Sequence, residues 1–147
     1  MSVARSLSRL ACGSAAARAQ HVRDVIRPAL DAGKWVVTDR YIDSSLAYQG
    51  AGRDLGIDTV WDINAPAVDG CLPDIAIVLD VPPSISAERA SGPGDRFESE
   101  GVGLQENVAA GYRELTLRFP DRVTLVAALG TPEQVHASVM AALAGLL

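Results

Sequence analysis

The first clear pattern along the chain is an apolar stripe at helical spacing, which Gly33 ends. The apolar run at residues 34–38 then predicts a short strand, and its continuous apolar character predicts burial on both faces. Ser44 predicts the cap of a further helix that runs towards Gly50 or Gly52. The members of the first stripe are Val22, Val25, Ile26, Ala29 and Leu30.

The middle of the chain continues this alternation of helices and strands. Residues 57–68 predict a helix, and residues 74–81 form the clearest strand pattern. Pro82 and Pro83 end that strand, and residues 84–89 predict the start of another helix.

The last third predicts a long helix, a strand and a final helix. Pro120 closes the long helix, and residues 122–127 form the next strand. Thr131, with Glu133 and Gln134 in the first turn, predicts the start of the final helix. The apolar stripe of the long helix consists of Leu104, Val108, Tyr112, Leu115 and Phe119. That of the final helix consists of Val135, Val139, Met140 and Leu143.

Strands that alternate with helices predict an α/β fold, with a parallel sheet covered by helices on both faces. Ligands of such folds bind at the carboxyl ends of the strands. The positions that matter most are therefore residues 39–41, 81–82 and 127–128.

Composition narrows the classes of function. The 147 residues favour one domain, and 48% of them are hydrophobic, which is enough for a substantial core. Asp and Glu outnumber Lys and Arg by 18 to 13, which argues against a general nucleic-acid binder. Cys12 and Cys71 form no metal-ligand pattern and are expected to be reduced thiols. No apolar run reaches the length of a membrane span.

Residues 1–17 form an atypical N-terminal segment, with Arg5, Arg9, several Ser and Ala, and no acidic residue. This composition resembles an organellar transit peptide. The alternative, which we favour, is a misplaced start, a truncation or a frameshift upstream of a bacterial gene's core.

Asp39 and Arg40 follow the apolar run directly. The Arg guanidinium is a planar, permanently charged fork that suits phosphate oxygens. The neighbouring carboxylate could orient that fork or help to hold Mg²⁺ through its water shell. The alternative is a salt bridge that ties the strand end to a helix.

Polar groups before and after this dipeptide add context. Arg18 lies four residues before Val22 on the helical stripe, so its side chain either points at a cleft or extends to water. Residues 44–53 place hydroxyls, an aromatic ring, an amide and another cation after Arg40. That stretch could equally be a polar helix start with an ordinary packing tyrosine.

In combination, four segments from about Arg18 onward resemble thymidylate kinases of the bacterial type, in the family's order and at nearly its spacing. Gly111 and Tyr112 in the long helix also fit. The segments are Arg-Ala-Gln-His-Val at 18–22, Val-Val-Thr-Asp-Arg-Tyr at 36–41, Ser-Ser-Leu-Ala-Tyr-Gln-Gly at 44–50 and Asp-Arg-Phe-Glu at 95–98. Residues 18–147 are thus expected to form a thymidylate kinase-like domain.

The resemblance implies a cytoplasmic enzyme of nucleotide biosynthesis that phosphorylates dTMP to dTDP with ATP and Mg²⁺. Arg40 would hold the acceptor phosphate, with Asp39 beside it at the phosphoryl-transfer centre. Arg18 would hydrogen-bond the thymine edge, and Tyr48 would lie under the sugar. Ser44, Ser45 and Gln49 would complete the substrate pocket, with Ser45 near the thymine ring nitrogen.

The resemblance also implies a mobile lid at residues 91–96. Arg89 and Arg96 would be its phosphate contacts, and Glu98 would lie near the metal or its waters. No direct metal ligand is implied, since Asp39 and Glu98 would act through water. The implied partners are dTMP, ATP and a second copy in a homodimer, without nucleic-acid polymer or membrane.

The sequence departs from the family pattern at the ATP site. No GxxxxGK[ST] motif occurs, and that loop cradles ATP phosphates in such kinases. The implied fold is therefore a three-layer P-loop kinase-like sheet that lacks its first two strands and its P-loop. Strands without neighbours predict a chain that is poorly stable alone or recruits a partner.

Smaller departures lie elsewhere. The family's thymine-stacking Phe would fall at Ser14, and the acid before the Arg falls at Ala17. Ala127 stands where the family tends to carry an acid. Three hypotheses remain: a dTMP kinase, a non-catalytic remnant that binds nucleotide or a partner, and a kinase of another nucleoside or nucleotide.

Overall fold

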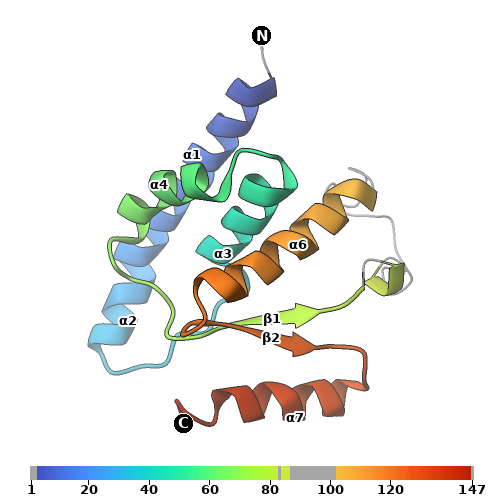
Figure 1. The fold of residues 1–147 in the computed structure, drawn as a ribbon. Coiled ribbons are helices and arrows are strands. Elements are labelled where there is room, and N and C mark those ends of the chain that lie inside the picture. The colour runs from blue at the N-terminus through green and yellow to red at the C-terminus, as the bar shows by residue number, and fades with distance from the viewer. Residues whose placement is uncertain (1–2, 83, 87–101, 147) are drawn as a thin grey trace. The chain divides into compact units, whose positions relative to one another are not determined.

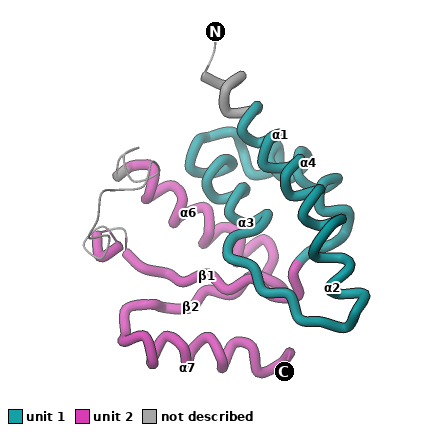
Figure 2. Tube along the Cα trace, turned by 180° about the vertical axis from the view of Figure 1, so that it is seen from behind, with its two compact units in different colours: residues 1–72 teal, residues 73–147 magenta. Residues whose placement is uncertain are grey.

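The computed structural model describes residues 3–82, 84–86 and 102–146. The chain divides into two compact units, residues 1–72 and 73–147, which are coloured separately in Figure 2. In the described residues, the first unit is helical and the second holds the strands (Figure 1).

The first unit begins with one long helical stretch, which Gly33 ends at a positive φ of 71° as predicted. Two segments of the first unit, η1 and η2, are π-helical turns, a rare form that occurs often at functional sites. Residues 57–68 form a helix with the predicted bounds. The elements are α1 (Val3–His21), η1 (Val22–Ile26), α2 (Arg27–Asp31), α3 (Ile42–Ser45), η2 (Leu46–Gly52) and α4 (Ile57–Val68).

The core of the first unit forms where α1 packs against α4, and α4 against η2 (Figure 1). The stripe expected to begin near Val22 reaches back to Ala11, because α1 is helical from Val3. The buried residues of α1 include two small ones, Ala11 and Ala15. The buried apolar residues are Ala11, Ala15, Val22, Ile26, Ile42, Leu46, Ala47, Ile57, Val60 and Val68.

The predicted strand at residues 34–38 is wrong. The segment is not assigned as a strand, and its side chains Trp35 and Val37 are 70% and 94% exposed. A strand requires a neighbour for its backbone groups, and the described part of the first unit contains none.

The predicted cap at Ser44 is also wrong. The helix begins at Ile42, two residues earlier, so Ser44 lies inside it. The backbone turns at Arg40, which has a φ of 63°, and the chain enters the helix directly after Tyr41. Of the two predicted ends, Gly50 and Gly52, the helical segment η2 ends at Gly52.

The described part of the second unit contains two parallel strands, as predicted, with Ala76 opposite Val123 and Asp80 opposite Ala127. Both α6 and α7 contact β2, and they lie on opposite sides of the strand pair in Figures 1 and 2. Its elements are β1 (Ala76–Asp80), α6 (Val102–Arg118), β2 (Val123–Ala127) and α7 (Pro132–Leu143).

The helices of this unit lie where the sequence predicted them, but the predicted apolar stripe of α7 is not buried, and its Met140 is 41% exposed. Val108 and Leu115 of the predicted α6 stripe are buried. Thr131 and Gln134 form a reciprocal capping box at the start of α7, as their spacing indicated.

The α/β class is confirmed, whereas the three-layer sheet of a P-loop kinase stays a prediction. A helical turn spans 84–86 of the helix predicted at 84–89. Arg89, Arg96, Glu98 and the predicted lid lie outside the described residues.

Candidate functional site

The side chain of Arg18 interrupts the buried stripe of α1. It follows Ala15 by three residues and precedes Val22 by four, and both of these neighbours are buried. A cation in the middle of such a stripe is forced against the helices that cover it. Arg18 is indeed only partly exposed, so its charged head requires polar partners from those helices.

Three groups supply those partners. Nη1 of Arg18 donates a hydrogen bond to Oδ1 of Asn64 on α4. Nη2 donates to the Tyr41 carbonyl oxygen at 3.2 Å and to Oγ of Ser45 on α3 at 2.8 Å. The guanidinium carbon also lies 5.5 Å from the centre of the Tyr41 ring, a cation–π contact. Arg18 is thus held by groups from α3, from α4 and from Tyr41, which directly precedes α3.

Burial lowers the pKa of Arg18 from its ordinary value, and the nearby Tyr41 and Asp43 partly offset that effect. Asp43 is itself buried on α3. An arginine remains charged at any physiological pH even after such a shift. The site therefore holds a permanent, partly desolvated cation in a fixed orientation.

A second cation lies at the start of α3. The guanidinium carbon of Arg40 is 5.1 Å from the centre of the Tyr48 ring on η2. The Arg40 backbone has a φ of 63°, a left-handed conformation that costs a residue with a Cβ about 1–2 kcal/mol. Asp39 beside it is exposed. An exposed anchored cation next to a carboxylate suits an anionic ligand.

Gln49 of η2 faces α1. Its Nε2 donates to Oγ of Ser14 at 3.4 Å, and its Oε1 is buried without a hydrogen-bond partner among the described residues. Ser14 thus contacts an amide at the position where the family's aromatic residue was expected.

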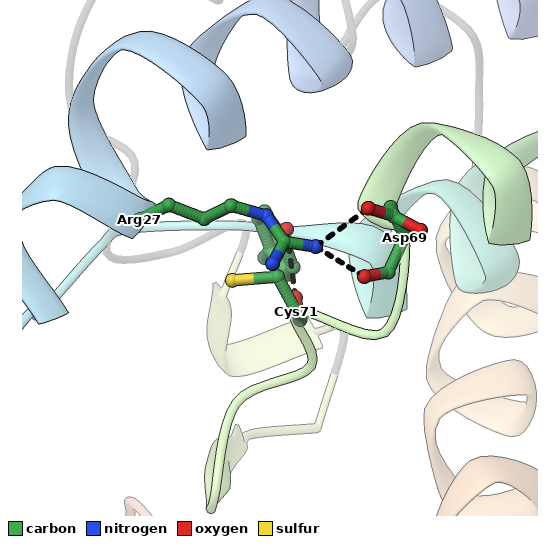
Figure 3. Close-up of polar contacts among 4 residues, drawn as sticks. Arg27, Asp69 and Cys71 are labelled. Carbon is green, nitrogen blue, oxygen red and sulfur yellow. Dashed lines mark hydrogen bonds and ion pairs between the residues drawn. The ribbon is translucent and has the colours of Figure 1, made fainter. Parts of the chain in front are cut away.

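Polar contacts join the segment after the end of α4 to Arg27 and to Tyr41. Arg27 donates to both the carbonyl oxygen and the carboxylate of Asp69, the latter at 2.8 Å (Figure 3). Two residues further on, the Cys71 carbonyl oxygen accepts a hydrogen bond from the Tyr41 hydroxyl at 3.0 Å. Both ends of Tyr41 are therefore bonded, its carbonyl to Arg18 and its hydroxyl to the segment after α4.

The structure brings some of the predicted site residues together. Arg18 bonds directly to Ser45, and Arg40 contacts Tyr48. Asp39, Ser44 and the other predicted residues up to position 49 belong to the same unit. Their roles towards a ligand stay predictions.

Sequence reasoning missed Asn64 and Asp43 as parts of this network, and it singled out Tyr41 within the 39–41 run without assigning it a role. The position of Asn64 could have been noticed in the sequence, since it falls between Val60 and Val68 at helical spacing, and both of these are buried. A polar residue inside an apolar stripe on each of two helices predicts that the two meet.

Comparison with known proteins decides the family. A protein-family model described as "Thymidylate kinase" matches residues 2–139. The chain belongs to the thymidylate kinase family. The match begins ahead of Arg18, although the boundary proposed between residues 17 and 18 stays a prediction.

Curated thymidylate kinases from several bacteria are similar to this chain. That of Leuconostoc citreum is 48% identical over 116 residues, which are 76% of this chain and 54% of the relative. That of Rhizorhabdus wittichii is 42% identical over 137 residues, which are 90% of this chain and 66% of the relative. The chain spans about half the length of the first of these thymidylate kinases, at 54%, and two thirds of the second, at 66%.

Thymidylate kinases as a family use ATP and Mg²⁺. The described residues do not fit either group by themselves. They contain no cluster of three or more His, Cys, Asp or Glu side chains that could hold a metal ion. The printed sequence contains no GxxxxGK[ST] loop for ATP phosphates. Within the part of the chain that is described, no helix is long and apolar enough to cross a membrane.

Proposed function

We propose that this chain carries the acceptor half of a dTMP kinase, which binds dTMP for phosphorylation to dTDP by ATP. The observation that supports this proposal best is the hydrogen bond between Arg18 and Ser45, because each was expected at the thymine. A second contact, between Arg40 and Tyr48, joins the residues expected at the phosphate and the sugar. Family membership supplies the reaction.

In this proposal Arg40 binds the phosphate of dTMP, because a guanidinium fork can donate two hydrogen bonds to phosphate oxygens. The Tyr48 ring limits the directions that this guanidinium can take. Asp39 lies beside Arg40 at the phosphoryl-transfer centre.

Arg18 donates to a carbonyl oxygen of the thymine, and Ser44, Ser45 and Gln49 line the base and sugar pocket. The Oε1 of Gln49 is buried and accepts no hydrogen bond among the described residues, so it retains its capacity to accept one. Arg89, Arg96 and Glu98 belong to the same proposal as lid and metal-water residues.

ATP and Mg²⁺ would supply the phosphoryl group and neutralise its charge during transfer. Because the described residues do not fit these groups, the roles above concern acceptor binding. The homodimer and the cytoplasmic location expected from the resemblance remain parts of the proposal.

A second candidate function is a non-catalytic thymidylate kinase remnant that binds nucleotide or a partner. It requires no ATP phosphate loop, and the printed residues contain no GxxxxGK[ST] motif. The two candidates share the acceptor site and differ in turnover.

A coupled assay of the full chain with ATP, Mg²⁺ and dTMP separates them. Turnover that disappears in Arg40→Ala and persists in Arg23→Ala supports the kinase. Arg23 is a suitable control, because its side chain is 74% exposed and pairs with Asp24 on the surface. Absent turnover with retained dTMP binding supports the remnant, and absent dTMP binding contradicts the acceptor site that the two candidates share.

A further inference from the structure

Two helices of the first unit each carry one polar residue inside a buried apolar stripe, and these two residues meet. On α1, Arg18 interrupts the stripe that contains Ala15 and Val22. On α4, Asn64 interrupts the stripe that contains Val60 and Val68, and Asn64 is 0% exposed. A leucine at position 64 would fill the same space without burying an amide, so the asparagine requires a reason other than packing.

Both ends of the Asn64 amide are hydrogen-bonded. Nδ2 donates to the Val60 carbonyl oxygen at 2.8 Å, and Oδ1 accepts from Nη1 of Arg18. The partners fix the orientation of the amide, because a flipped amide would place its NH₂ against the Arg18 donor. A buried amide destabilises the fold unless both its oxygen and its NH₂ group are hydrogen-bonded. Arg18 supplies the hydrogen bond to the oxygen.

Asn64 in turn restricts Arg18. The guanidinium is bonded at Nη1 by Asn64 and at Nη2 by Ser45 and the Tyr41 carbonyl oxygen. These bonds use three of the five N–H groups and hold the guanidinium at both of its terminal nitrogens. The remaining two N–H groups therefore point in directions that the protein has already set.

We propose that Asn64 is a positioning residue that fixes Arg18 so that it accepts a base with a carbonyl oxygen at its edge and rejects one with an amino group there. This proposal rests on the proposed function, in which Arg18 meets the pyrimidine of dTMP. An arginine has donors alone, so the amino group of cytosine would face another donor. A fixed guanidinium cannot turn away from that clash, whereas a loose one can.

The test is the ratio of affinities for dTMP and dCMP, measured by titration calorimetry on the full chain. Asn64→Leu keeps the volume and removes the acceptor, and we expect the dTMP preference to fall about tenfold or more. Asn64→Asp keeps the acceptor for Arg18 but loses the donor to the Val60 carbonyl, so it is expected to keep the preference at a cost in stability. A purely structural role would weaken both nucleotides equally and leave the ratio unchanged, which would overturn the proposal.

A second variant covers the case in which Asn64→Leu does not fold. Asn64→Ser places a hydroxyl that can bond to the Val60 carbonyl but is too short to reach Arg18. We expect it to lose the dTMP preference as Asn64→Leu does, and a retained preference overturns the proposal. If the unaltered chain binds neither nucleotide, the proposed function fails as well. If it prefers dTMP and both variants keep that preference, the positioning role alone fails.

Discussion

The guanidinium carbon of Arg40 lies 5.1 Å from the centre of the Tyr48 ring, while the Arg40 backbone is held at a φ of 63°. The side chain has an anchoring contact, and its backbone has a conformation that glycine would adopt more easily. Conformational strain at a residue with an exposed charge suggests that the charge is retained for binding.

This relationship predicts that the backbone conformation at position 40 affects the stability of the chain separately from the Arg40 side chain. Arg40→Gly and Arg40→Ala both remove the charge and the ring contact, but only glycine relieves the left-handed conformation. We expect the Gly variant to be about 1 kcal/mol more stable than the Ala variant. Urea unfolding measures the difference, with fluorescence from Trp35 and Trp61 reporting on the first unit. Equal stability of the two variants would show that the backbone is not strained.

Gly50 predicts a second stability effect, at the contact between η2 and α4. A Cβ at position 50 would lie 3.0 Å from the Cα and 3.2 Å from the N of Ile57, and that backbone is held by the bond from Gly56 N to Gly50 O at 3.0 Å. We expect Gly50→Ala to destabilise the chain by roughly 1–3 kcal/mol, since backbone atoms must shift.

Gly13 is the matched control, because a Cβ at that position in α1 meets nothing within 4 Å. Gly13→Ala is expected to stabilise the chain by about 0.5–1 kcal/mol in the same unfolding experiment. A similar loss in both variants would contradict the close approach of η2 to α4.

The contact between Arg27 and Asp69 predicts small losses of stability whose sizes differ between variants. Asp69 ends α4 at a φ of 46°, and Arg27 bonds to its carboxylate and its carbonyl. Because the two side chains are 45% and 84% exposed, Arg27→Ala should cost about 0.5–1 kcal/mol. Asp69→Asn should be tolerated better than Asp69→Ala, since asparagine accepts the left-handed conformation. Equal losses for Asn and Ala, measured by thermal unfolding, would contradict this reading.

Tyr41 predicts an alkaline limit to stability. Burial, followed by the nearby Cys71, raises the pKa of the Tyr41 hydroxyl above its ordinary value of 10.0. The fold therefore favours the neutral phenol, so this contribution is fully present below pH 10.0 and is lost as the pH rises through the higher folded value. Unfolding measured from pH 8 to about 11 should show a decline that Tyr41→Phe reduces. An unchanged decline in that variant would assign it to other groups.

The sequence predicted those parts of the fold that depend on neighbours close along the chain. The helix at 57–68 and the Thr131–Gln134 capping box follow from local spacing, and both were correct. The strand at 34–38 depends on a distant partner, which local pattern cannot supply, and it was wrong. Exposed Trp35 and Val37 show the consequence.

The candidate site was likewise predictable only where its residues belong to recognisable sequence segments. The spacing of Arg18 and the run after Arg40 indicated polar groups in one place, and Arg18 does bond to Ser45. Asn64 was missed, because its role depends on the packing of α1 on α4 rather than on its own neighbours. A search for polar residues inside apolar stripes would have paired it with Arg18.

The central claim is that Arg40 binds the phosphate of dTMP, and calorimetry of dTMP against thymidine tests it most directly. The full chain should bind dTMP more tightly than thymidine, and Arg40→Ala should lower dTMP affinity about 10- to 100-fold while leaving thymidine affinity unchanged. Arg23→Ala should leave both affinities unchanged. Equal losses for dTMP and thymidine in Arg40→Ala, or no binding of either by the unaltered chain, would contradict the claim.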